Sequence, residues 1–218
     1  MAGLRPTPRT MSDIKSKLLR PATTSHFECF FAPPKAVKNA MKEKNKAGAG
    51  VDYSGEVQDL INISCFDASL PGSSFQTANL TDSYTGVNET YAYRRAYDNR
   101  ADFSFYVDHN DGKNNYQVIL FFENWMSFIA DEQFTENNNG VKLDAPNYFY
   151  RLNYPDDYAS SNISITKFEK DYKGRGLRYD FLYAYPISIA SMPVSYDASQ
   201  VLKCTVSFNY QRYTVQGA

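Results

Sequence analysis

Few residues in this sequence could bind a metal ion, and those few lack the spacing of a metal site. The two histidines, His26 and His109, fall in a predicted strand and near a predicted turn, and neither has partner ligands at the usual spacing. The segment 108–115, DHNDGKNN, is similar to a calcium-binding loop, but its glycine comes one place early and its twelfth position is Ile119 rather than glutamate. We therefore predict no bound metal and no cofactor.

Catalytic groups are equally sparse. Carboxylates that could pair for acid–base chemistry occur at Asp156-Asp157, Glu169 and Asp171, but a chain with 24 acidic residues contains such neighbours without any catalytic role. The sequence has no G-x-S-x-G motif, no phosphate-binding loop and no dinucleotide-binding fingerprint. We therefore predict no catalytic residues and a protein that is not an enzyme.

The composition favours a protein that makes extensive surface contacts. Aromatic residues make up 16% of the chain, and 18 residues are tyrosine. Tyrosine combines a large contact area with a polar hydroxyl, so an excess of it is typical of subunit interfaces and of glycan-binding surfaces. The formal net charge of −1 is not the basic excess that holds nucleic acid, although it is compatible with a surface that lets DNA pass.

The cysteines and the hydropathy pattern predict a cytosolic compartment. Cys29, Cys65 and Cys204 are an odd, widely spaced set in strand-like segments, which favours reduced core thiols over a disulfide framework. The first residues, MAGLRPTPRT, lack the apolar segment of a signal peptide. No apolar run reaches the length of a membrane span, so we expect no membrane contact.

The clearest structural signal is a strict alternation near the end of the sequence. Within the predicted strand 200–213, apolar and polar side chains alternate, and a period of two indicates one buried and one solvated face. The apolar set is Leu202, Cys204, Val206, Phe208 and Tyr210, and the polar set includes Lys203, Thr205, Ser207 and Asn209. Further strands are predicted at 26–31, 57–66, 100–108, 148–154, 161–169 and 177–185.

The remaining segments predict a hairpin, one helix and a less certain stretch. Residues 75–98 predict a long hairpin that turns near 84–86 and has too few apolar residues to be stable alone, so it should lie on another surface. Residues 116–132 predict an amphipathic helix, with Asn114 or Asn115 as its N-cap. Lys35–Lys46 predicts either a short surface helix or a mobile loop, and residues 1–24 an extended arm. The elements together predict a single α+β domain over residues 1–218, mainly antiparallel, built as a small β-sandwich or barrel-like subunit with one packed helix.

Several motifs, taken in order, resemble a known family. They are Cys65-Phe-Asp-Ala-Ser-Leu-Pro-Gly72, Phe103-x-Phe105-x-Val107, Phe122-x-x-Trp125-x-x-x-Ile129, Tyr183-x-Tyr185-Pro186-Ile187-Ser188-Ile189, Ser195-Tyr196-Asp197 and the alternating terminal strand. This order is similar to that of the tail tube proteins of T-even-type contractile-tailed phages, in the version carried by their cyanobacterial-phage relatives. The resemblance covers about residues 20–33 and 57–215.

The resemblance implies a structural virion protein rather than an enzyme. It implies a subunit that gives strands to a hexameric ring barrel, with its helix outside, and rings that stack into a hollow conduit for DNA ejection inside a contractile sheath. The implied partners are the tail sheath protein, the tape-measure protein, the baseplate initiator, the tail terminator and DNA in passage, with assembly in the host cytoplasm. Relative to shorter family members, residues 33–56 and 134–147 appear as surface insertions, and 171–177 also looks enlarged.

Two alternatives and two sets of site residues follow from the same reading. The alternative functions are a baseplate tube initiator of the same fold and, in a different class, a carbohydrate-binding or adhesion β-domain. Within the tube reading, the hairpin is predicted to be the main contact between subunits, through Phe75, Tyr91, Tyr93, Arg94 and Arg95. The predicted residues facing the lumen are Lys203, Thr205, Ser207 and Asn209.

Overall fold

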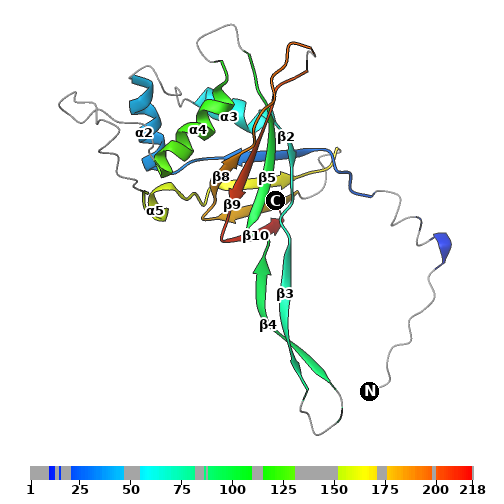
Figure 1. Cartoon of the computed structure of the whole chain (residues 1–218). Coiled ribbons are helices and arrows are strands. Elements are labelled where there is room, and N and C mark those ends of the chain that lie inside the picture. The colour runs from blue at the N-terminus through cyan, green and yellow to red at the C-terminus, as the bar shows by residue number, and fades with distance from the viewer. Residues whose placement is uncertain are drawn as a thin grey trace.

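The computed structural model of the chain contains two four-stranded antiparallel sheets and a protruding two-stranded ribbon (Figure 1). The structure describes residues 10–12, 15, 21–46, 55–81, 86, 88–109, 115–130, 152–170, 176–197 and 200–217. Sheet A has the order β1 (Phe27–Phe31), β6 (Ile163–Lys167), β7 (Leu177–Leu182), β10 (Arg212–Gly217). Sheet B has the order β2 (Cys65–Ala68), β5 (Arg100–Tyr106), β9 (Lys203–Asn209), β8 (Tyr185–Ile189), and the ribbon is β3 (Ser73–Leu80) with β4 (Glu89–Tyr97). The prediction of an α+β fold dominated by antiparallel strands is confirmed.

The core lies between the two sheets and is built from alternate residues of their strands. In sheet B, β5 and β9 pair so that Phe103 lies opposite Val206 and Phe105 opposite Cys204, and these inward side chains are at most 1% exposed. Sheet A closes the core from the other side, with Phe31 packed edge-on to Phe103 at a ring-centroid distance of 5.0 Å. The alternation predicted for Leu202–Tyr210 is therefore confirmed, and it positions one strand in the centre of sheet B.

Helix α4 (Gln117–Ile129) covers the part of the inner face of sheet B that sheet A leaves open (Figure 1). Its fully buried apolar face includes Phe121, Phe122 and Trp125, as its periodicity predicted, and the indole Nε1 of Trp125 donates to the Tyr158 carbonyl at 3.0 Å. The predicted asparagine cap is wrong. The N-cap residue is Tyr116, which has a left-handed φ of 58° and makes no side-chain capping bond.

The strand predicted at 57–66 is wrong for most of its length. Residues Gly55–Ser64 form helix α3, and only Cys65 and Phe66 belong to a strand, β2. Val57 and Ile61, one helical turn apart, are both buried, whereas Ile63 is 82% exposed. The helical i, i+4 spacing of Val57 and Ile61 therefore determined the structure of this segment, and the alternation of Ile61, Ile63 and Cys65 did not.

Three helices accompany α4 among the described residues, so the prediction of one packed helix was incomplete. They are α2 (Lys35–Lys46), α3 and the short α5 (Pro155–Tyr158). Of the two structures predicted for the lysine-rich segment, the helix is the correct one, and its Val37 and Met41 are at most 1% exposed. No helix in the described parts of the chain is both long and apolar enough to cross a membrane.

Two predicted strands are each divided in the structure. Strand 177–185 ends at Leu182, Tyr183 takes a left-handed φ of 54°, and β8 then begins at Tyr185. The segment 200–213 likewise leaves sheet B after Asn209 and enters sheet A as β10. Of the predicted strand 148–154 only Leu152 to Tyr154 are described, and Leu152 makes an isolated bridge to Ala130. The predicted loop 134–147 and most of the arm 1–24 lie outside the described residues, and the arm, the insertions and the domain limits stay predictions.

The three cysteines are free and buried, one each in β1, β2 and β9. A hydrogen bond with Cys65, together with burial, raises the pKa of Cys29, and burial raises the pKa of Cys204 to about 11. Because all three thiols are buried, we expect a thiol reagent at about pH 8 to label none of them in the native protein. All three should react in denaturant, where the thiols are exposed. Rapid labelling of one thiol in the native protein would show that its site opens readily.

Candidate subunit interface

The β3–β4 ribbon leaves the body of the molecule with both of its faces in solvent (Figure 1). Every residue of β3 is exposed, and so are the residues of β4 from Glu89 to Arg95. Its large side chains are open as well, with Phe75 64%, Tyr91 58% and Tyr93 66% exposed. An isolated two-stranded hairpin is marginally stable in water, so a ribbon of this kind is expected to lie against another molecule.

The predicted interface residues all lie on this ribbon, but the structure divides them between its two faces. Phe75 is the direct cross-strand partner of Arg95, and Gln76 that of Arg94. The register then shifts between Gln76 and Thr77, and the hydroxyl of Tyr93 donates to Gln76 Oε1 at 3.1 Å. One face therefore carries Phe75 with Arg95, and the other carries Arg94 with the tyrosines. A partner that covers only one face contacts only part of the predicted set.

A small polar cluster, which we call the clasp, joins the base of the ribbon to the body of the molecule. Gly72 N–H donates to Asp98 Oδ2 at 3.0 Å, and Asp98 N–H donates to the Gly72 carbonyl at 3.3 Å. Ser73 Oγ accepts from Arg95 Nη2 at 2.9 Å and from the Tyr213 hydroxyl at 3.1 Å. Since Tyr213 belongs to β10, these contacts tie the direction of the ribbon to the edge of sheet A.

Gly72 leaves no room for a side chain at this clasp. A Cβ at this position would lie 2.4 Å from Asp98 Oδ2, which is the atom that accepts the Gly72 N–H bond. We expect Gly72→Ala to push the Asp98 carboxylate aside and to cost about 0.5–1.5 kcal/mol locally, the usual net contribution of the hydrogen bond that is lost. Hydrogen exchange of β3 and β4 amides should become faster, while exchange in sheet B stays unchanged.

The matched control for the clasp is the double variant Gly72→Ala with Asp98→Ala, which removes both the steric conflict and the carboxylate bond. If the β3 and β4 amides of the single and double variants exchange hydrogen at the wild-type rate, the clasp does not hold the ribbon.

The predicted lumen residues lie along the outer face of β9, and the structure gives each a different environment. Lys203 is exposed, and its Nζ lies 5.1 Å from the ring centroid of Phe66. Thr205 is half-buried and bonded to Ser104 at 3.0 Å. Ser207, expected to be solvated, is only 5% exposed because Arg100 and Asp102 cover it. Asn209 is half-buried at the end of the strand.

Two of the charges on this face, those of Arg100 and Asp102, neutralise each other. Arg100 Nε and Asp102 Oδ1 form an ion pair at 3.0 Å, and the Ser207 hydroxyl donates to the same carboxylate. The hydrogen bond from Ser207, followed by the bond and charge of Arg100, lowers the pKa of Asp102. The face therefore carries one ion pair together with the exposed Lys203, whose Nζ lies over the rings of Phe66 and Tyr106.

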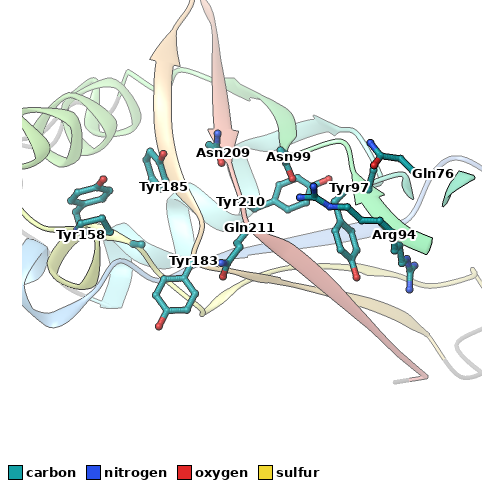
Figure 2. Close-up of a pocket in the computed structure, with 14 residues that line it drawn as sticks. Gln76, Arg94, Tyr97, Asn99, Tyr158, Tyr183, Tyr185, Asn209, Tyr210 and Gln211 are labelled. Atoms are coloured by element: carbon teal, nitrogen blue, oxygen red, sulfur yellow. The ribbon is translucent and has the colours of Figure 1, made fainter. Parts of the chain in front are cut away.

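A pocket of about 870 Å³ lies between the base of the ribbon and the body. Figure 2 shows Tyr158, Tyr183 and Tyr185 at one end, Gln76, Arg94 and Tyr97 at the other, and Tyr210 between them. The tyrosines come from segments far apart in the sequence, and the tyrosine excess is the one sequence signal that pointed toward them. The structure thus adds a site that residue spacing did not indicate.

The residues first considered for metal binding are not brought together. Within the described ranges, no group of three or more His, Cys, Asp or Glu side chains could hold a metal ion. His26 Nδ1 lies 2.9 Å from the neighbouring Ser25 hydroxyl, and the ring of His109 lies 6.4 Å from that of Tyr116. These two rings have local partners in different parts of the molecule.

Comparison with known proteins identifies the group to which this fold belongs. The family model described as phage tail tube protein matches residues 22–216, which is nearly the whole chain. The chain belongs to the phage tail tube protein family. This tail tube protein is therefore a structural component of a phage tail, as its ordered motifs predicted. A search of curated proteins found no match.

Solved structures of low sequence identity share the fold. The tail tube protein aligns with a chain of the PVC sheath–tube complex in the extended state at 10% identity and a TM-score of 0.50, covering 97% of this chain and 100% of that one. It aligns with the anti-feeding prophage tube-terminating cap at 13% and 0.50, covering 100% of both chains. It aligns with a chain of the anti-feeding prophage baseplate at 12% and 0.51, covering 91% and 97%.

Proposed function

We propose that copies of this tail tube protein join through the free edges of sheet B into six-membered rings, and that the rings stack into a hollow conduit for DNA. Strand direction supports this joint. All three neighbouring pairs in sheet B are antiparallel, so the two edge strands, β2 and β8, run in opposite directions. A copy rotated about an axis parallel to the strands presents its β2 beside β8 and continues the alternation, and closing the circle removes both free edges of sheet B.

The two faces of sheet B differ in a way that fits such a ring, with the face toward the core of the subunit directed away from the conduit and the opposite face directed toward it. The inner face is covered by sheet A and by helix α4, whereas the outer face is open and polar. If α4 points away from the axis of the ring, the face of β9 opposite the subunit core lines the conduit. The residues on this face are Lys203, Thr205, Ser207 and Asn209. On this polar surface Arg100 is paired with Asp102 and Lys203 is exposed, so DNA phosphates would meet few strong contacts and DNA would slide through.

The ribbon is the observation that carries the proposal. Its two strands continue β2 and β5 beyond the end of sheet B, and neither of its faces is covered (Figure 1). A ribbon in this state is completed by another chain, and identical neighbours in a ring or in the next ring would supply it.

The joint can be tested by cross-linking the two edges of sheet B. Asp67 in β2 and Ser188 in β8 are both exposed, and the native cysteines are buried. With both replaced by cysteine, a short bis-maleimide should give a ladder of covalent oligomers that stops at the hexamer. Single-cysteine variants are the control and should give dimers at most. Rings in negative-stain images without any ladder would place the joint elsewhere, and a strictly monomeric protein would refute the assembly itself.

The remaining partners follow from the same proposal. The tube would contact a tail sheath protein on its outside, a tape-measure protein inside, a baseplate initiator at one end and a tail terminator at the other, after assembly in the host cytoplasm. The protein would act through assembly, without catalysis, cofactor or membrane contact. The alignment with a sheath–tube complex and with a tube-terminating cap supports these partners at the level of the fold.

A baseplate tube initiator is the second candidate, because a chain of a baseplate shares the fold. An initiator should form single rings that stop growing, whereas a tube subunit should form long tubes. Electron microscopy of the purified protein with increasing concentration separates the two.

A further inference from the structure

The end of sheet B farthest from the ribbon carries a groove of about 740 Å³, which we call the end groove. It lies between the last residue of β5, the first residue of β9 and the connection from β8 to β9. Val194 is 86% and Val201 65% exposed, so two aliphatic side chains of its lining are left in water. Among the described residues that line the groove, Lys203 is the only charged one. An exposed apolar surface of this kind is typical of a contact with another protein.

The outer part of the ribbon, residues 77–80 and 89–92, has a matching character, and we call it the distal ribbon. Leu80 lies opposite Glu89, and Ala78 lies opposite Tyr91. Because side chains two positions apart on a strand share a face, these four side chains lie on one face of the ribbon. Leu80 and Tyr91 are each more than half exposed. Glu89 is the only acidic residue among the described residues of β3 and β4.

The charges of the two surfaces are opposite and lack ionic partners. The Tyr91 hydroxyl donates a hydrogen bond to Glu89, and Lys203 Nζ lies 5.1 and 5.9 Å from the ring centroids of Phe66 and Tyr106. Neither Glu89 nor Lys203 forms an ion pair with a residue that the structure describes. One acidic and one basic group, each beside exposed apolar side chains, make the distal ribbon and the end groove complementary.

The distal ribbon and the end groove lie at opposite ends of the subunit (Figure 1). Arg100 pairs with Asn209 at the ribbon end of sheet B, and Tyr106 pairs with Lys203 at the other end. Seven residues of strand span roughly 20 Å, and the ribbon extends away from the sheet. One subunit therefore cannot bring its own distal ribbon to its own end groove. Different surfaces at opposite ends of one molecule join head to tail, and such a contact repeats as a stack.

We propose that the end groove receives the distal ribbon of a copy in the next ring, with Glu89 paired to Lys203. The inference rests on the proposed rings and names the surfaces through which they stack. Because the strands of sheet B run along the ring axis in that assembly, the ribbon leaves one ring in the direction of the next. The same pair neutralises the exposed lysine of the conduit face.

Reversal of the two charges tests the pair. Glu89→Lys and Lys203→Glu should each lower the mass of sedimented tubes several-fold, because each places like charges in the contact. The two changes together should restore most of the yield, because the pair forms again with opposite polarity. Glu43→Lys, at an exposed position of α2, makes the same charge change as Glu89→Lys and should leave the yield unchanged. Normal yield from the single variants, no recovery in the combination or an equal loss from the control overturns the proposal.

Photo-cross-linking tests the contact independently of charge. The photo-cross-linking amino acid p-benzoylphenylalanine replaces Val201, and tubes are assembled from equal amounts of isotope-labelled and unlabelled protein. After irradiation and digestion, mass spectrometry should show cross-links between copies to the distal ribbon. Cross-links within one copy only, or between copies only to other segments, overturn the proposal.

Negative-stain images separate a failure of this inference from a failure of the proposed function. The single charge variants should still close into rings, because their β2 and β8 edges are unchanged. If these variants form both rings and tubes as the wild-type protein does, only the stacking contact is wrong. Wild-type protein that forms no rings refutes the proposed function, and this inference with it.

Discussion

Replacing Arg94 and Arg95 together by glutamate should leave a folded subunit that assembles into tubes very poorly. Both residues lie on the exposed ribbon, and both line the pocket at its base. Neither contributes a buried contact to the core between the sheets, so the subunit should unfold at nearly the wild-type temperature. Placing two negative charges at a subunit contact typically costs several kcal/mol through repulsion and lost hydrogen bonds.

The matched control for the arginine variant is Lys35→Glu with Lys42→Glu. Both lysines are exposed on α2, and the double replacement changes the formal net charge of −1 by the same four units. Sedimentation of assembled tubes and circular dichroism of the subunit give the two readouts. Wild-type tube yield from the arginine variant would remove the ribbon from the interface, and an equal loss in the lysine control would indicate a general charge effect.

The largest expected loss of stability comes from Phe208→Ala. The ring of Phe208 contacts rings from sheet A, from β5 and from α4 at centroid distances of 5.5 to 5.9 Å, and its side chain is 1% exposed. Removing a buried phenylalanine costs about 3–5 kcal/mol, because the cavity adds to the lost transfer free energy. That is a large share of the roughly 5–15 kcal/mol that stabilises a typical domain.

Urea denaturation of the subunit measures the effect of Phe208→Ala. Phe208→Leu is the control, and it should lose clearly less because most of the volume is kept. A loss below about 1 kcal/mol for the alanine variant would show that the aromatic cluster relaxes into the space.

The sequence predicted those elements whose side-chain period had a single interpretation. The alternation of β5 and β9 and the helical spacing of α4 were each read correctly, because their apolar residues are large and regularly spaced. Gly55–Ser64 was misread, because Ile61, Ile63 and Cys65 also fit a strand. The breaks at Tyr183 and after Asn209 were missed, because no proline or glycine stands at either break.

The candidate site was predictable only in part. The sequence located the hairpin because its segment lacks apolar content for a core of its own, and the role of its residues in subunit contacts stays a prediction. The pocket was not, because Tyr97, Tyr158, Tyr185 and Tyr210 meet only after the chain has returned several times to the same end of sheet B. Contacts of that kind depend on topology, which single-sequence periodicity does not report.

The position of β9 in sheet B has a consequence for biosynthesis. This strand lies between β5 and β8, yet it occupies residues Lys203–Asn209 of the 218 in the sequence. While the ribosome is still translating, β5 and β8 have no strand to join them, and the sheet stays incomplete until these late residues emerge. Under the proposed ring assembly, the edges of sheet B would become competent for pairing only after Lys203–Asn209 have emerged, so neighbouring nascent chains on one messenger RNA would not associate earlier.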